Sequence, residues 1–335
     1  MSDDDLWLLS DPIDPQPNGP RNRLSGSPDI IAIIAEWRQA EASHAASLAR
    51  ASGLFGALDD RLRRGPAGWR QRLALIEAAD LSWYLGDRVS ADRLALWITL
   101  RLSGVQDDTA ALARASWAVR RLSGGPGPQA DLAAFLDRRN PEDDDADGDT
   151  LLVRADSWLE LIAYADKLHP IVRAAMGFHL WNLAGLGHFD TRIEAAVSAS
   201  RLAASEASRA VFVPLAMGGA TGLRTTGPAA QRLGRWLEGL NAGCRTAMRY
   251  LDMIEAWHER AGADMAQLSG RTPAKLRAIL MEWPLVSAPM AEALTGASRA
   301  AVQRNLIWME KHNLIQEVTG QGRYKMWRAI ERPQR

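Results

Sequence analysis

The sequence predicts a mostly α-helical fold, in which many helices form a body and a small β-hairpin appears only near the C-terminus. Three observations carry this prediction. Between residues 28 and 264, apolar residues recur every three or four positions, and no alternating strand pattern is evident. Glycines follow several of these segments, as they do at helix ends. Near the C-terminus, residues 319–323 form a glycine-rich turn between two short segments that favour strands.

The composition is that of an ordinary globular protein. The chain has 335 residues, of which 47% are hydrophobic and 24% charged. This length predicts two or three packed units. Cys244 is the only cysteine, which excludes an internal disulfide and a cysteine-based zinc site and fits a reducing compartment. No apolar run has the length of a membrane span, and the acidic start has the wrong charge for a signal peptide. We therefore expect a cytoplasmic protein with no membrane partner.

The charges are unevenly distributed along the chain. The formal net charge is zero. Between Arg271 and Arg335, however, 11 Lys and Arg residues stand against 5 Asp and Glu residues. The preceding 270 residues carry the compensating acidic excess. A basic C-terminal segment on an acidic body is expected to contact a polyanion.

The first half predicts an irregular arm and a helical domain. Residues 1–27 carry proline and glycine without periodicity and form the expected N-terminal arm. Residues 28–139 form the expected helical domain, whose first helix should end near residue 51 because Gly53 follows. Three further helices are expected over residues 67–85, 91–102 and 108–122. Residues 140–149 predict an acidic linker, and we interpret its consecutive aspartates as solvated rather than as a metal site.

Residues 150–264 predict a second helical domain, with helices over residues 150–166, 170–184 and 190–207. The segment 210–226 contains Pro214 and several glycines, which predict a buried turn between helices. It lacks the Gly-Lys-Ser/Thr ending of a phosphate-binding loop.

The longest helix is expected over residues 228–261. Its apolar residues step by four and three positions: Leu233, Leu237, Leu240, Cys244, Ala247, Leu251 and Ile254. This seam is compatible with a coiled-coil dimer stalk or with a central core helix, and the core helix is favoured. Gly239 and Gly243 favour close packing against a neighbouring element.

The strongest functional pattern lies in residues 272–330. Three helices are expected there, opened by Thr272-Pro273, Ser287 and Ser298. The second and third helices are joined by the short turn Thr295-Gly296-Ala297, as in a helix-turn-helix unit. Two strand-favouring segments follow, over residues 314–318 and 324–329. Three helices followed by a hairpin are the order of a winged helix-turn-helix domain.

The third helix, from residue 299 to about 312, is expected to pack through Val302, Leu306 and Met309. Its early outward positions would then meet base edges in the DNA major groove. These base-reading candidates are Arg299, Ala300, Gln303 and Arg304. Arginine pairs with guanine and glutamine with adenine through two hydrogen bonds. The candidate phosphate contacts are Ser298, Lys275, Arg277, Arg323 and Lys325.

These residues predict a sequence-specific binder of double-stranded DNA, and hence a transcriptional regulator. The alternative is a winged helix that binds a protein partner in a scaffold. Ile307 and Trp308, on the same helix, are larger and more apolar than the surface of a solitary domain usually allows. We expect the body or a second copy of the chain to cover them. Together with the seam of the long helix, they predict a homodimer.

Parts of the sequence resemble an uncharacterised alphaproteobacterial family, often plasmid-borne in rhizobia. The resemblance lies in residues 290–306 (MAEALTGASRAAVQRNL), in residues 317–324 (EVTGQGRY), in the run Ala79–Leu100 with DLSWYLGDRVSADRLAL, and in Val213-Pro214-Leu215-Ala216. It extends over the chain from about residue 60. The family pairs a helical domain of unknown function with a terminal DNA-binding-type domain, and the resemblance implies a DNA-binding regulator.

The chain also faintly resembles Fic-type AMP transferases, which place a winged helix after a helical body. Their His-Pro-Phe…Gly-Asn-Gly-Arg loop is absent, because Ile171 follows His169-Pro170 and no Gly-Asn-Gly occurs. No two of the six histidines have the i, i+4 spacing of a helical metal site, and no Gly-x-Ser-x-Gly occurs. His179 is expected to be a hydrogen-bonded core histidine, and Glu77 and Asp80 could pair with the many arginines. We expect no enzymatic activity, metal or cofactor.

Overall fold

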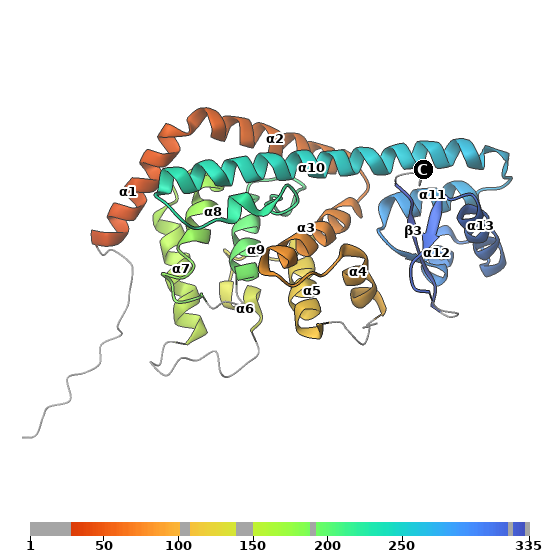
Figure 1. Cartoon of the computed structure of the whole chain (residues 1–335), viewed down its shortest axis with the longest axis horizontal. Coiled ribbons are helices and arrows are strands. Elements are labelled where there is room, and N and C mark those ends of the chain that lie inside the picture. Colours follow the sequence, from red (N-terminus) through yellow and green to blue (C-terminus); the bar gives the residue numbers. More distant parts are fainter. Residues whose placement is uncertain (1–27, 101–107, 139–149, 188–191, 321–323, 332–335) are drawn as a thin grey trace, which may run out of the picture.

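The computed structural model describes residues 28–100, 108–138, 150–187, 192–320 and 324–331, and within them the chain is mostly α-helical, as predicted (Figure 1). The helices of the first half are α1 (Pro28–Ser43), α2 (Ala45–Arg64), α3 (Trp69–Leu85), α4 (Ala91–Leu100), α5 (Thr109–Ser123) and α6 (Leu132–Leu136). Those of the second half are α7 (Leu151–Tyr164), α8 (Pro170–His179), α9 (Arg192–Ala203) and α10 (Ala229–Asp264), with short 3₁₀ turns η3 (Ala220–Leu223) and η4 (Met265–Gln267). The expected arm and acidic linker lie outside the described residues.

The first predicted helix differs from the structure at its end. The chain breaks at His44 and continues as α2 through Gly53 to Arg64. The helix tolerates Gly53 because Leu48, Phe55 and its other buried apolar residues keep a helical spacing on one face. Tertiary burial outweighs the intrinsic helix-breaking tendency of glycine here. The short helix α6 was not predicted, and α8 ends at His179 rather than near residue 184.

Helix α10 is the spine of the molecule. Its 36 residues span about 54 Å and run from the body into the C-terminal unit (Figure 1). The whole predicted seam from Leu233 to Ile254 is buried against α1, α2, η3 and α11 (Thr272–Glu282). The core-helix interpretation is therefore confirmed, and the dimer-stalk interpretation is wrong, because the chain itself covers the seam.

Helices on the two sides of residues 140–149 share one core. Helix α9 packs against α3 and α5, and α10 packs against α1 and α2. The buried apolar side chains of both segments belong to one continuous cluster. The described residues of 28–139 and 150–264 thus form one helical body.

A fully buried carboxylate fixes the turn between α9 and α10. Glu77 on α3 accepts hydrogen bonds from the backbone N–H groups of Leu215, Ala216 and Met217, at 2.8, 2.9 and 3.0 Å. Glu77 therefore pairs with backbone N–H groups rather than with an arginine. The predicted close packing of α10 is confirmed, since a Cβ at Gly243 would lie 2.5 Å from the carbonyl oxygen of Pro214.

The C-terminal unit combines three helices with a small sheet. Its elements are α11, β1 (Val286–Ser287), α12 (Ala288–Thr295), α13 (Arg299–Lys311), β2 (Ile315–Glu317) and β3 (Met326–Ala329). The antiparallel sheet has the order β1-β3-β2, so β3 pairs with both neighbours. Ser287 and Ser298 cap α12 and α13, as predicted, and Gly296 ends α12 with a φ of +66°. None of the described helices is long and apolar enough to cross a membrane.

Candidate nucleic-acid interface

Helix α13 has one fully buried face. Val302, Leu306 and Met309 are completely buried, and α13 packs against α11 and α12. Asn305 is also buried, and its Nδ2 donates to the carbonyl oxygen of Ala301 at 2.8 Å. The predicted inward face is confirmed. Burial of these side chains fixes the rotation of the helix about its axis and therefore which residues point outward.

The outward face of the first two turns carries the predicted base-reading residues. Arg299, Ala300, Gln303 and Arg304 are all exposed. Within the described residues, no hydrogen bond or ion pair engages the side chains of Arg299, Gln303 and Arg304. Ser298 is exposed at the helix N-terminus, where its Oγ accepts from the N–H of Ala301 at 3.4 Å. Helix N-termini attract anions through their unpaired N–H groups.

The two predicted phosphate contacts on α11 are engaged within the protein. Lys275 is exposed, but its Nζ donates to the carbonyl oxygen of Thr295 at 2.6 Å and so caps the C-terminus of α12. Arg277 lies against α10, where a Cβ on Gly262 would overlap its guanidinium. Sequence reasoning missed both structural roles because neither contact follows from spacing along the chain.

The connection between β2 and β3 is partly described. Arg323 lies outside the described residues, whereas Lys325 is exposed beside Tyr324. At the start of the connection, the carboxylate of Glu317 accepts from the N–H of Thr319 at 2.7 Å and from that of Gly320 at 3.2 Å. These bonds hold the first part of the turn in one conformation.

The second half of α13 exposes an apolar side chain. Ile307 is 63% exposed, and Leu294 on α12 is 51% exposed. Trp308 is half-buried and stacks on His312, with ring centroids 3.7 Å apart. The expectation that the body covers Ile307 is therefore wrong.

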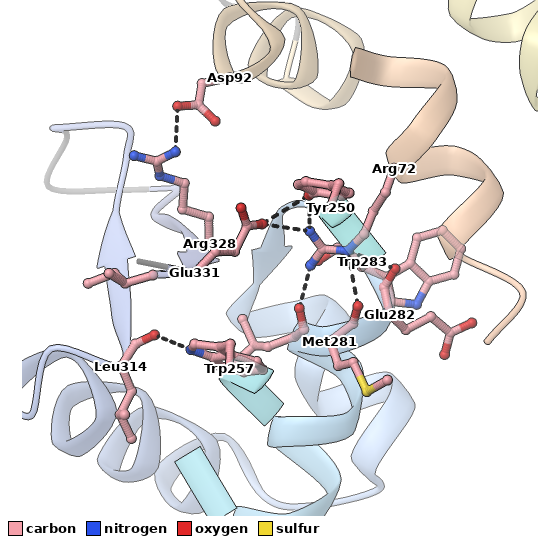
Figure 2. Close-up of polar contacts among 12 residues, drawn as sticks. Arg72, Asp92, Tyr250, Trp257, Met281, Glu282, Trp283, Leu314, Arg328 and Glu331 are labelled. Atoms are coloured by element: carbon pink, nitrogen blue, oxygen red, sulfur yellow. Dashed lines mark hydrogen bonds and ion pairs between the residues drawn. The ribbon is translucent and has the colours of Figure 1, made fainter. Parts of the chain in front are cut away.

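Arg72 of α3 fastens the C-terminal unit to the body (Figure 2). The side chain is only 2% exposed. Its Nη2 donates to the carbonyl oxygens of Leu280 and Trp283, at 2.5 and 2.6 Å, and its Nε donates to that of Met281 at 3.0 Å. These carbonyls at the end of α11 have no partner within the helix, so the buried guanidinium caps them.

Contacts from α10 and β3 complete this junction (Figure 2). The Nη1 of Arg72 donates to the hydroxyl of Tyr250 at 2.8 Å, and that hydroxyl donates to Glu331 at 2.9 Å. Trp257 Nε1 donates to the carbonyl oxygen of Leu314 at 2.7 Å. Arg328 on β3 forms an ion pair of 3.0 Å with Asp92 on α4. These contacts fix the orientation of the C-terminal unit, and with it the exposed face of α13, relative to the body.

Ser52 and His169 form a serine–histidine contact among the described residues, but the direction of its hydrogen bond is not that of a nucleophile and its base. His169 Nδ1 accepts from the N–H of Ile171 at 3.2 Å, and burial lowers the pKa of His169. The neutral ring therefore carries its proton on Nε2 and donates to Ser52 Oγ at 3.3 Å. Ser52 in turn donates to the carbonyl oxygen of Leu48 at 2.9 Å. A catalytic base would have to accept from the serine. Among the described residues, no group of three or more His, Cys, Asp or Glu side chains is arranged to hold a metal ion.

No protein-family model matches the chain, and no curated protein matches it.

Proposed function

We propose that the chain is a sequence-specific DNA-binding protein that acts as a transcriptional regulator. Residues 272–330 are a winged helix-turn-helix domain in this proposal. Helix α13 enters the major groove through its N-terminal half, and the 319–325 wing contacts phosphates. The observation that carries the proposal is the outward face of α13, where Arg299, Gln303 and Arg304 are exposed and engaged by no described residue.

Two physical arguments support this proposal. Side chains that meet base edges must be exposed in the free protein, and they must project from a backbone that is held in place. The buried face of α13 and the capping of α11 by Arg72 supply the rigid support. The excess of six basic residues between Arg271 and Arg335 supplies attraction to the phosphate backbone.

The experiment is a DNA-binding titration with the full chain. Preferred duplexes are first selected from a random pool, and binding is then followed by fluorescence anisotropy over a range of salt concentrations. We expect a preferred sequence, tighter binding to it than to a scrambled duplex, and an affinity that falls steeply with salt. Failure to bind any duplex at low salt would overturn the proposal.

The alternative function is a protein-interaction module. The exposed side chains of Leu294 and Ile307 favour it, because burial of apolar surface against a partner drives protein association. The same titration separates the two functions, since a pure protein-binding module has no sequence preference among duplexes. Ile307 lies one helical turn after Gln303 and Arg304 on the same face of α13, so the proposed DNA contact and the proposed homodimer contact are adjacent on this helix.

A further inference from the structure

Ala300 occupies the centre of the exposed face of α13. The inward direction of this helix is set by its buried side chains, which are Val302, Asn305, Leu306 and Met309. Successive residues of an α-helix are turned by about 100° around its axis, so Ala300 lies within about 10° of the direction opposite to the buried face. Gln303 and Arg304, one turn later, lie to either side of it, and all three residues are exposed.

The side chain of Ala300 differs from those of its neighbours because it has no polar atom. Arginine and glutamine distinguish bases through hydrogen bonds. A methyl group can neither donate nor accept a hydrogen bond, so the base feature that it can recognise in the major groove is the C5 methyl group of thymine. A small residue at the centre of the face also lets the helix backbone lie close to the floor of the groove, from which a longer side chain would hold it away.

The position of this methyl group is fixed by the backbone alone. Alanine has no rotamers to lose, so a contact through its Cβ costs no side-chain entropy. The backbone of the next residue, Ala301, is held at both its polar groups. Its N–H donates to Ser298 Oγ at 3.4 Å, and its carbonyl oxygen accepts from Asn305 Nδ2 at 2.8 Å. The first turn of α13 therefore presents the Ala300 methyl group in a defined place.

We propose that Ala300 is a specificity-determining residue that contacts the C5 methyl group of one thymine in the preferred duplex. The inference rests on the proposed DNA binding and adds the chemical group that is read. 5-Methylcytosine carries a methyl group on the same ring carbon. A cytosine–guanine pair at this position is therefore bound better when its cytosine is methylated, so DNA methylation at the site changes the affinity of the protein.

Deoxyuridine tests the contact from the side of the DNA, because its base lacks only the C5 methyl group of thymine. Each thymine of the preferred duplex is replaced by uracil in turn, and binding of the full chain is followed by fluorescence anisotropy. We expect the replacement at one position to weaken binding of the wild type about fourfold, the effect of no longer burying one methyl group. At the same position, a cytosine–guanine pair should bind about fourfold better with 5-methylcytosine than with cytosine.

Ala300→Gly tests the contact from the side of the protein. The substitution removes the Cβ methyl group and no polar group, so the variant should bind the thymine and uracil duplexes equally. Glycine also lowers the helix propensity of the first turn, but this effect acts on both duplexes alike and cancels in the ratio of their affinities. The matched control is Ala278→Gly, at an exposed alanine of α11, which should keep the wild-type ratio.

Ile307→Ala locates the reading residue along α13. Ile307 lies on the same face about two turns after Ala300, so this variant should keep the wild-type ratio between the thymine and uracil duplexes. A ratio that is lost in Ile307→Ala and kept in Ala300→Gly would overturn the assignment. A preferred duplex without thymine, or one in which no uracil weakens binding, would overturn it too. Both results leave sequence-specific binding intact, whereas a failure to bind any duplex overturns the proposed function together with this inference.

Discussion

Some basic side chains of the C-terminal unit make contacts within the protein, whereas others are exposed and make none among the described residues. Lys275 caps α12 and Arg277 packs on α10, although both were predicted to contact phosphates. Arg304 and Lys325 are exposed, and no hydrogen bond or ion pair holds either side chain within the described residues. The two exposed residues are therefore the ones that test the proposed division between base reading and phosphate binding.

Arg304→Ala should reduce specificity, and Lys325→Ala should reduce affinity. Arg304 projects from the second turn of α13, opposite Leu306, so its loss should cost about 1–3 kcal/mol on the preferred duplex and little on a scrambled one. Loss of Lys325 should weaken both duplexes alike and reduce the salt slope by roughly one unit. Anisotropy titrations over a range of salt measure both. If Arg304→Ala lost the same amount of binding free energy on both duplexes, α13 would not read bases.

Glu77 makes the stability of the body depend on pH. Burial raises the pKa of Glu77 to about 7, against an ordinary value of 4.5, although three backbone N–H donors oppose this. The folded protein therefore holds a proton that the unfolded chain releases. The resulting stabilisation is complete below pH 4.5 and is lost as the pH rises through 7. Burial also raises the pKa of Asp80, to about 6, which acts in the same direction.

Glu77→Gln should remove the part of this pH dependence that comes from Glu77, because an amide does not titrate. We expect the free energy of unfolding of the wild type to fall relative to that of the variant between pH 4.5 and 7.5. Urea denaturation at several pH values measures the difference, and Asp80→Asn should remove a separate part of the pH dependence that is lost at a lower pH. Parallel curves for the wild type and Glu77→Gln would show that Glu77 is ionised throughout this range.

At the scale of whole elements, the sequence correctly predicted the features that depend on residues close together in the chain. The serine caps, the Gly296 turn and the spacing of Val302, Leu306 and Met309 placed α12 and α13 correctly. The start of α2 was missed, since nothing in the sequence around His44 signals a break. Helix length was also misjudged where a glycine lies on an exposed face, because burial of the opposite face continues the helix.

Contacts between distant elements could not be predicted from the sequence. Arg72 lies among apolar residues on α3, and its partners at Leu280 and Trp283 follow about 200 residues later. The three backbone donors of Glu77 lie about 140 residues after it. An arginine or glutamate between buried positions signals a buried polar contact, but it does not identify the partner.

The junction between α3 and α11 predicts a large loss of stability for Arg72→Leu. The substitution leaves the carbonyl oxygens of Leu280, Met281 and Trp283 without their donor in a buried site, and we expect a cost of about 3 kcal/mol or more. The matched control is Arg328→Ala, which breaks a partly exposed ion pair across the same junction and should cost at most about 1 kcal/mol. Urea denaturation measures both. Similar losses in the free energy of unfolding for the two variants would show that Arg72 does not stabilise the junction more than Arg328 does.

At the scale of the whole molecule, helix α10 joins the helical body to the C-terminal unit as one continuous element (Figure 1). Its apolar seam is buried against other elements of the same chain, so the seam is not available to a second copy. The apolar surface that remains on the C-terminal unit includes Leu294 and Ile307. A dimer of this chain should therefore form through the C-terminal unit rather than through a stalk.

We expect the wild type to associate on DNA and Ile307→Glu to remain monomeric. A single winged helix reads few base pairs, and a twofold arrangement doubles the site. Burying a glutamate in an apolar contact is unfavourable, so the substitution should abolish pairing without disturbing the monomer, in which Ile307 is 63% exposed. Light scattering on a palindromic duplex measures the number of 36.7 kDa chains bound. The matched control is Ile31→Glu, at an equally exposed isoleucine on α1 of the body, which should pair as the wild type does. One wild-type chain per palindromic duplex would contradict the dimer. If pairing were lost in Ile31→Glu but kept in Ile307→Glu, the interface would lie on the body and not on the C-terminal unit.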